Sequence, residues 1–154
     1  MSQIKTTLSV EDKQLLIRNG RLKFLLHASQ QEIYDQFYAW RAKLVKDSAA
    51  LQDLNGAWPR TFVTMLSRRL GKDYMGLVLL AEQAIRNPNT TYTYVAATRA
   101  DIQDILTSPQ LLPKLSQDFP PECRLEYKSA HRGMAEGLYV HNGSVIKLQG
   151  LDLK

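Results

Sequence analysis

The spacing of apolar residues changes once along this chain, near residue 90, and that change decides the fold class. Before residue 90, apolar side chains recur every three or four positions, as on one face of an amphipathic helix. From Thr90 to Ala97, β-branched and aromatic residues follow one another, which is typical of a strand. We therefore expect helices in the N-terminal part of the chain and a small sheet in the C-terminal part.

A single long helix is predicted over residues 9–46. Ser9 offers an N-cap, and the carboxylates of Glu11 and Asp12 favour the positive end of a helix. Gly20 weakens the helix by about 1 kcal/mol relative to alanine, and it marks either a break or a close contact.

An apolar stripe runs along this predicted helix and keeps its phase through Ser29, which favours one helix over a break at that point. A stripe of this length packs either on the protein's own core or on a helix of a partner. The candidate partner-binding residues are Leu22, Leu26, Ile33, Phe37 and Trp40, and Leu44 continues the stripe.

Two further helices are predicted between the long helix and the sheet. A loop at residues 53–59 separates the first of them from the long helix. That helix ends at Gly71, which suits the C′ position. Asp73 is expected to cap the second helix, and Asn87-Pro88-Asn89 stops it.

The C-terminal part is predicted to combine one helical segment with strands. Thr98 and Asp101 resemble a capping box for a helix that Pro109 interrupts. A half-buried strand is expected at residues 123–128, where apolar and charged residues alternate. Asn142-Gly143, between two apolar runs, is the strongest short-range signal for a β-hairpin.

These elements predict an α+β fold. A long N-terminal helix and two further helices are followed by a small β-α-β-β-β unit with a C-terminal hairpin. The length of 154 residues suits one domain. We expect a single domain over residues 1–154, with the long helix at 9–46 and a compact α+β part at 57–150.

The sequence also predicts where the protein works. It has no run of about 18 apolar residues that could insert into a membrane. The N-terminal residues lack the basic-then-apolar pattern of a secretion signal. Its one cysteine, Cys123, excludes an internal disulfide framework. We therefore expect a cytoplasmic protein.

Motifs for catalysis, cofactors or metals are not found. Neither G-x-x-x-x-G-K-[ST] nor G-x-G-x-x-G occurs, so no phosphate-binding loop is predicted. Cys123, His131 and His141 match no standard zinc spacing, and no nucleophile signature surrounds the cysteine. The sequence thus predicts a non-enzyme without cofactor or metal. An unrecognised enzyme would need a cleft that joins Cys123, His131 and a carboxylate.

The net charge of +5 belongs to the N-terminal half of the chain. Residues 1–88 hold 13 Lys and Arg against 8 Asp and Glu, whereas residues 89–154 hold 7 of each. Basic side chains neutralise phosphates and aromatic faces stack on bases, so a nucleic-acid-binding module is the alternative function. Its candidate residues are Arg18, Arg21, Lys23, Arg41, Lys43, Arg68 and Arg69.

Several segments together carry a family resemblance. Residues 21–37 read Arg-Leu-Lys-Phe-Leu-Leu-His-Ala-Ser-Gln-Gln-Glu-Ile-Tyr-Asp-Gln-Phe, and Lys43-Leu44 follows. A strand and a short helix come later, and residues 134–148 form a glycine bend and a hairpin. This order resembles the C-terminal domain of the E-type peripheral-stalk proteins of V/A-type ATPases and their relatives, the FliH/SctL-type regulators of flagellar and type III secretion ATPases.

The resemblance implies a stalk protein whose partners are a second stalk protein and a catalytic ATPase subunit. The leading functional hypothesis is therefore a non-catalytic structural or adaptor subunit that docks on a larger protein assembly. Its expected partners are other protein subunits of a complex, with nucleic acid as the alternative, and no membrane insertion is expected.

Overall fold

The structure is a computed structural model that describes residues 8–47, 63 and 71–151. It confirms the mixed α+β fold class, with helices packed on a four-stranded sheet that ends in a hairpin. The helices are α1 (Val10–Arg18), α2 (Ala28–Asp47), α3 (Lys72–Arg86), α4 (Arg99–Thr107) and α5 (Leu112–Ser116), with 3₁₀ turns η1 (Lys23–Leu25) and η2 (Pro121–Cys123). The strands are β1 (Thr91–Ala96), β2 (Glu126–Lys128), β3 (Gly137–Tyr139) and β4 (Val145–Gly150).

The N-terminal helix is divided, so the prediction of one uninterrupted helix over residues 9–46 is wrong. Its start is as predicted, because Ser9 forms a capping box with Asp12. Gly20 then adopts a φ of +57°, which ends α1. The Gly20 N–H donates to the Ile17 carbonyl at 2.8 Å and the Arg21 N–H to the Leu16 carbonyl at 2.9 Å. These are the two hydrogen bonds of a Schellman C-cap, after which the chain turns through η1 into α2.

Helix α3 begins differently from the prediction, although it ends as predicted. Gly71, with a φ of +62°, occupies the N-cap position, and no side chain caps the helix. Asp73 lies inside the first turn and accepts a hydrogen bond from the Tyr94 hydroxyl at 3.1 Å. Asn87 is the C-cap, directly before Pro88. The helix expected just before Gly71 lies outside the described residues.

The sheet has the order β1-β4-β3-β2. Strand β1 pairs in parallel with β4, while β4 with β3 and β3 with β2 pair antiparallel. The hairpin predicted at Asn142-Gly143 is confirmed, because the turn between β3 and β4 contains both residues and Gly143 has a φ of +85°. The capping box of Thr98 and Asp101 at the start of α4 is also confirmed.

The strand predicted at residues 123–128 is shorter than expected, and only Glu126–Lys128 forms β2. Cys123 belongs instead to η2, where its N–H donates to the Pro120 carbonyl at 2.9 Å. The ring of Pro121 fixes φ near the helical value at the first position of this turn, which explains why the chain enters the sheet later.

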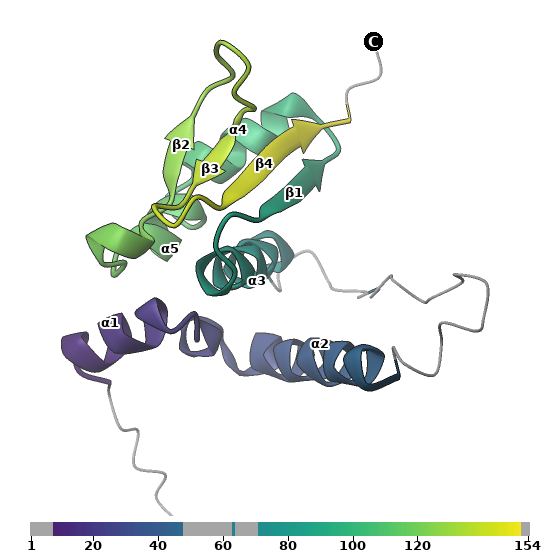
Figure 1. Cartoon of the computed structure of the whole chain (residues 1–154), viewed down its shortest axis with the longest axis vertical. Helices are drawn as coiled ribbons and strands as arrows, with labels where there is room; N and C mark the ends of the chain where they lie inside the picture. Colours follow the sequence, from purple (N-terminus) through teal and green to yellow (C-terminus); the bar gives the residue numbers. More distant parts are fainter. Residues whose placement is uncertain (1–7, 48–62, 64–70, 152–154) are drawn as a thin grey trace, which may run out of the picture.

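The described elements form layers, with the core between them (Figure 1). Helices α3 and α4 cover one face of the sheet, and α1 and α2 lie beyond α3. The core between sheet and helices includes Leu77, Ile102 and Ile146, all 2% exposed or less. Ile17 and Leu22 extend the core toward the N-terminal layer, and both are fully buried. Among the described residues, no helix combines the length and apolar character needed to cross a membrane.

Candidate docking surface

One face of the sheet is not covered by any described helix. Along β1, Tyr92 and Tyr94 point toward the helices, whereas Thr91, Thr93 and Val95 are exposed on the other side. The register extends this second set across the sheet, since paired residues of neighbouring strands point to the same face. We call it the open face, and it consists of Thr91, Thr93, Val95, Val145, Lys147, Gln149, Gly137, Tyr139, Glu126 and Lys128.

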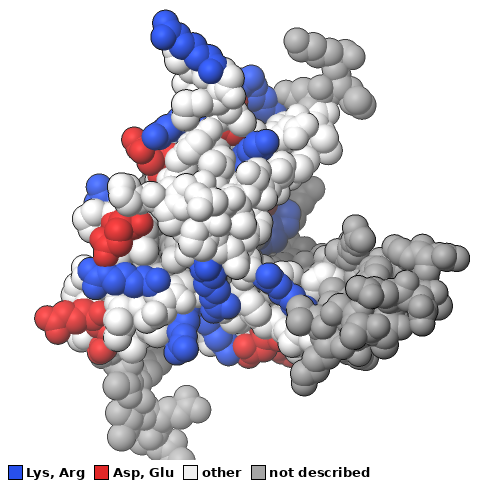
Figure 2. All heavy atoms as spheres, in the orientation of Figure 1, with Lys and Arg blue, Asp and Glu red and all other residues white. Residues whose placement is uncertain are grey.

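Uncharged side chains occupy the middle of the view onto this face, with both basic and acidic side chains around them (Figure 2). The aromatic member of the open face is Tyr139 on β3, which is half-buried. Val145 beside it is also half-buried, and Val95 is 49% exposed. In the register, Lys147 lies between Val145 and Gln149 on the inner strand β4, so apolar and polar side chains are interleaved on the open face.

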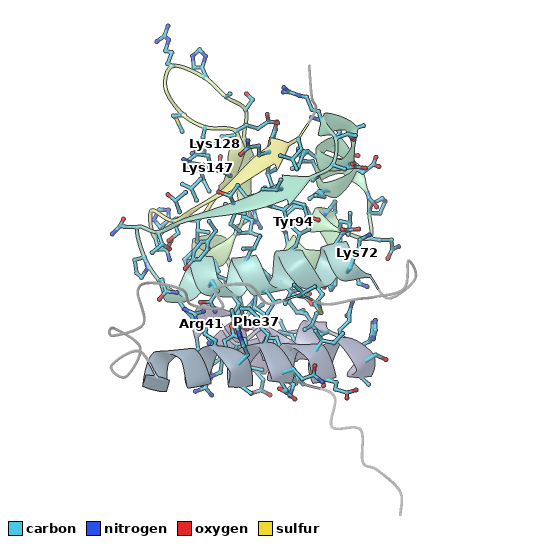
Figure 3. All side chains as sticks on the ribbon, turned by 90° about the vertical axis from the view of Figure 1, so that its right-hand side faces the viewer. Phe37, Arg41, Lys72, Tyr94, Lys128 and Lys147 are labelled. Carbon is cyan, nitrogen blue, oxygen red and sulfur yellow. The ribbon has the colours of Figure 1, made fainter. Side chains whose placement is uncertain are left out.

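Two lysines project from the open face, on the side of the sheet away from α4 (Figure 3). Lys128 places its Nζ 5.3 Å from the centroid of the Tyr139 ring and 3.3 Å from a carboxylate oxygen of Glu126. These contacts hold Lys128 over the aromatic ring. Lys147 on β4 is exposed and forms no ion pair with a described residue. Its charge is thus available to a partner.

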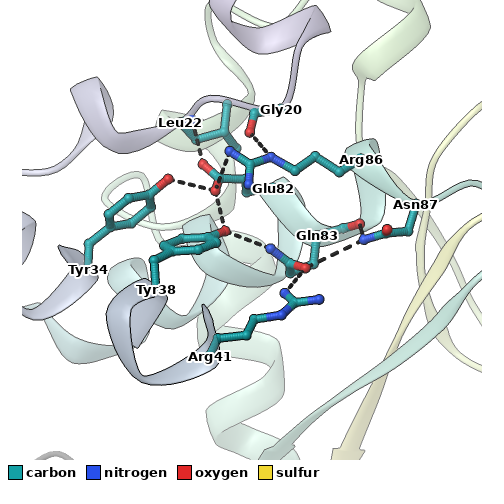
Figure 4. Close-up of polar contacts among 9 residues, drawn as sticks. All are labelled: Gly20, Leu22, Tyr34, Tyr38, Arg41, Glu82, Gln83, Arg86 and Asn87. Carbon is teal, nitrogen blue, oxygen red and sulfur yellow. Dashed lines mark hydrogen bonds and ion pairs between the residues drawn. The ribbon is translucent and has the colours of Figure 1, made fainter. Parts of the chain in front are cut away.

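A buried polar cluster joins the N-terminal layer to α3 (Figure 4). At its centre is Glu82, whose side chain is fully buried. One carboxylate oxygen accepts the Leu22 N–H at 2.6 Å. The other accepts the Tyr34 hydroxyl at 2.6 Å and the Tyr38 hydroxyl, and lies 3.1 Å from the Arg86 guanidinium. Burial and the hydrogen bond to Glu82 raise the pKa of Tyr38 to about 12, so its hydroxyl remains a donor at neutral pH.

The neighbours of Glu82 extend this cluster along α3. The Gln83 amide donates to the Tyr38 hydroxyl at 2.6 Å, and Arg41 of α2 donates to the Gln83 side-chain oxygen. The Arg86 Nε donates to the Gly20 carbonyl at 2.6 Å, where α1 ends. The cluster therefore joins the turn after α1, helix α2 and helix α3 through side-chain hydrogen bonds.

The predicted partner-binding stripe is split between core and surface. Leu22 is fully buried and Leu26 is 4% exposed, so both serve the core, one of the two roles expected for the stripe. Ile33, Phe37 and Trp40 are half-buried on α2. The rings of Phe37 and Trp40 pack together with their centroids 5.8 Å apart. For these three residues, the contact with a partner helix stays a prediction.

Of the residues predicted to bind nucleic acid, four have side chains that the structure describes, and the site they were predicted to form stays a prediction. Arg18 pairs with Glu122 at 2.5 Å, and Lys23 pairs with Asp35 at 2.7 Å. Arg21 and Arg41 are exposed, the latter with its bond to Gln83. The Lys43 side chain, Arg68 and Arg69 lie outside what the structure describes.

The residues considered for catalysis or metal binding show no sign of activation. Cys123 is 5% exposed, and burial raises the pKa of its thiol, the opposite of what an activated nucleophile requires. His131 lies in the exposed bend between β2 and β3, where its backbone pairs with Met134. In the described ranges, no three His, Cys, Asp or Glu side chains are grouped so as to hold a metal ion.

The open face was not found from the sequence, although a signal for it exists. In residues 145–149, Val-Ile-Lys-Leu-Gln, Ile146 and Leu148 are buried and alternate with the outward Lys147 and Gln149. Alternation shows that a strand has one covered face, but it does not show whether another element covers the opposite face. That depends on the strand order.

Comparison with known proteins does not identify the chain: no protein-family model, no curated protein and no solved structure matches it significantly.

Proposed function

We propose that this protein is a non-catalytic structural subunit that docks on a larger protein assembly, with the open face of its sheet as the docking surface. The observation that supports this most is the contrast between the two faces of the sheet. Helices α3 and α4 pack on one face, while the other carries apolar side chains and two lysines with no described element over them. A sheet with antiparallel strands can leave one face to solvent, but exposed apolar side chains on such a face mark a site of contact with another protein.

The chemistry of the open face suggests the chemistry of the partner. Tyr139, Val145 and Val95 favour an apolar contact, and Lys147, on the inner strand β4, favours a carboxylate within that contact. The occupant that fits is the surface of another protein that presents apolar side chains together with acidic ones.

The type of assembly rests on the sequence resemblance alone. An ATPase peripheral stalk in the cytoplasm is the assembly that the resemblance implies, and its stalk and ATPase subunits are the proposed partners. In such an assembly, the open face and the half-buried residues of α2 provide two separate contacts. Ile33, Phe37 and Trp40 are the proposed contact with a partner helix.

The proposal can be tested by isolating the tagged protein from its native cell extract, with and without nuclease, and identifying its partners by mass spectrometry. Reversal of both open-face lysines, Lys128→Glu with Lys147→Glu, should reduce the recovered partner protein about tenfold or more. Placing like charges across an interface costs several kcal/mol, which is enough for such a loss. Circular dichroism checks that the variant is folded.

Arg21→Glu is the matched charge reversal, because Arg21 is exposed but belongs to the N-terminal layer. We expect this variant to recover as much partner as the wild-type protein does, and nuclease to have no effect. Partners that disappear with nuclease, or with Arg21→Glu but not with the open-face variant, would favour the nucleic-acid alternative and contradict docking through the sheet.

A further inference from the structure

Strand β1 forms one edge of the sheet and has a neighbour on one side only among the described strands. Its partner β4 bonds to alternate residues: the Val145 N–H donates to the Thr90 carbonyl at 2.9 Å and the Leu151 N–H to the Ala96 carbonyl at 3.0 Å. In a parallel ladder, every second residue turns its backbone groups to the same side. The even-numbered residues of β1 therefore face β4, and the backbone N–H and C=O groups of Thr91, Thr93 and Val95 face outward.

These outward groups form no hydrogen bond with a described residue. The strand sequence, Thr-Tyr-Thr-Tyr-Val-Ala, is rich in residues that favour strands and contains neither Pro nor Lys. Proteins usually protect a free edge with Pro or Lys, with a bulge or with a covering segment, because an open edge pairs readily with another strand. The β1 edge is thus suited to accept an additional strand.

A cavity of about 770 Å³ lies at the C-terminal end of β1. It is bounded by the last residues of β1, the first turn of α3 and the inner side of α4. Tyr94 and Lys72 line this cavity, and Figure 3 shows both side chains next to α3. The cavity is on the helix side of the sheet, since Tyr94 points to that side. Edge and cavity are therefore continuous through Val95 and Ala96.

The cavity has an excess of negative charge. Asp73, Asp101 and Asp104 line it together with a single cation among the described residues, Lys72. Lys72 lies 3.6 Å from Asp73, and Asp101 caps α4 through Thr98. Asp104 forms no ion pair or side-chain hydrogen bond with a described residue and is exposed. A positively charged side chain in the cavity would find an unpaired carboxylate there.

A strand added along the β1 edge would join these two features. Its side chains would alternate between the open face and the helix side of the sheet. Those on the helix side, beside Tyr94 and Ala96, would point toward the cavity and its carboxylates. Main-chain hydrogen bonds then give affinity, and the side chain in the cavity gives specificity, as in other cases of strand addition.

We propose that the β1 edge binds an extended segment of a partner protein as a fifth strand, with a Lys or Arg side chain of that segment in the cavity beside Asp104. This inference rests on the proposed docking function and adds the kind of segment that the partner contributes.

The test uses the full chain and a library of random dodecapeptides displayed on phage. The selected peptides should alternate β-branched or aromatic residues with other residues and carry Lys or Arg at one fixed position. Affinities of one selected peptide are then measured by fluorescence anisotropy for the wild-type protein and three variants. Thr93→Pro removes one outward N–H without touching the bonds to β4, and an edge strand tolerates proline at such a position. Thr93→Val keeps the N–H and is the matched control.

We expect Thr93→Pro to weaken peptide binding about tenfold or more, the loss that corresponds to one unpaired hydrogen-bonding group. Asp104→Lys should weaken the basic peptide similarly and improve binding of the same peptide with Glu in place of its basic residue. Thr93→Val should bind as the wild-type protein does. Circular dichroism confirms folding, and Asp104→Lys keeps the test valid if Thr93→Pro does not fold.

Three results would overturn the inference: selection of no peptide, peptides that bind Thr93→Pro and Thr93→Val equally well, or affinity that does not depend on the charge at Asp104. The native isolation experiment separates this failure from that of the proposed function. If Thr93→Pro and Asp104→Lys still recover the partner while the open-face variant loses it, docking through the open face stands and strand addition is wrong.

Discussion

At the scale of single residues, Glu82 links the N-terminal layer to α3. Its buried carboxylate receives a backbone N–H from the turn after α1, two tyrosine hydroxyls from α2 and a guanidinium from its own helix. A buried charge is tolerated only when it is paired and hydrogen-bonded, and here both carboxylate oxygens are occupied. Three segments of the chain are thereby joined at one side chain: the turn after α1, α2 and α3.

Replacement of Glu82 by alanine should lower the free energy of unfolding by about 3 to 5 kcal/mol, because it leaves Arg86 and the hydroxyls of Tyr34 and Tyr38 without this acceptor. Glu82→Gln keeps one acceptor oxygen and should cost less. Urea unfolding followed by circular dichroism measures both. Glu122→Ala is the control, since its ion pair with Arg18 lies at the surface and should not change stability measurably. Equal stability of Glu82→Ala and wild type would show that the cluster is not structural.

Tyr38 predicts how stability depends on alkaline pH. Burial and the hydrogen bond to Glu82 raise the pKa of its hydroxyl from 10.0 to about 12 in the folded protein. Because the pKa of Tyr38 is higher in the folded protein, its contribution to the free energy of unfolding is complete below pH 10. That contribution is lost as the pH rises toward 12. The wild-type protein should therefore lose on the order of 2 kcal/mol more than Tyr38→Phe across this interval. Chemical unfolding at several pH values measures the difference, and parallel curves for the two proteins would contradict it.

At the scale of elements, the break between α1 and α2 shows where sequence reasoning failed. The spacing from Leu22 to Trp40 fits one helix, and the prediction followed that spacing. The actual contact face of α2 consists of Gln30, Tyr34, Tyr38 and Arg41, which bond to Gly71, Glu82 and Gln83 of the next segment. Their spacing of four, four and three is also helical, but polar side chains give no hydrophobic signal.

The break between α1 and α2 requires glycine at position 20 for two reasons that can be tested. Its φ of +57° favours glycine, and an added Cβ would lie 2.5 Å from Arg86 Cγ and 3.2 Å from the Glu82 carbonyl oxygen. Gly20→Ala should therefore lower the melting temperature clearly. Gly133→Ala is the matched control, because its φ is +88° but nothing lies within 4 Å of the added Cβ. The control should show only the backbone cost, about 1 to 2 kcal/mol. Equal effects of the two substitutions would exclude the close approach of α3 at Gly20.

Local signals predicted the C-terminal elements well. The capping box at Thr98, the β-rich run of β1 and the turn at Asn142-Gly143 each act over a few residues, so their outcome depends little on the rest of the chain. The candidate site was not predicted, because an open face is defined by strand order and by what does not pack on it. Neither property is local: β1 pairs with β4, about fifty residues later in the sequence.

At the scale of the whole molecule, the described part is a stack of helices on one side of a sheet. The polar cluster around Glu82 joins α1 and α2 to α3, and α3 and α4 pack on the sheet. The sheet ends this stack with an open face and a free edge at β1. Together they include strands β1 and β4, on which α3 and α4 pack from the other side.

Lysine labelling of the free protein and of the isolated native assembly tests docking through the open face most directly. Acetylation of each lysine is read by mass spectrometry. Lys147 and Lys128 should react readily in the free protein and become protected in the assembly. Lys13 of α1, which pairs with Asp118 and belongs to neither proposed contact, should react equally in both. If Lys147 and Lys128 react as fast in the assembly as in the free protein, the open face is not the docking surface and the account given for the sheet is wrong.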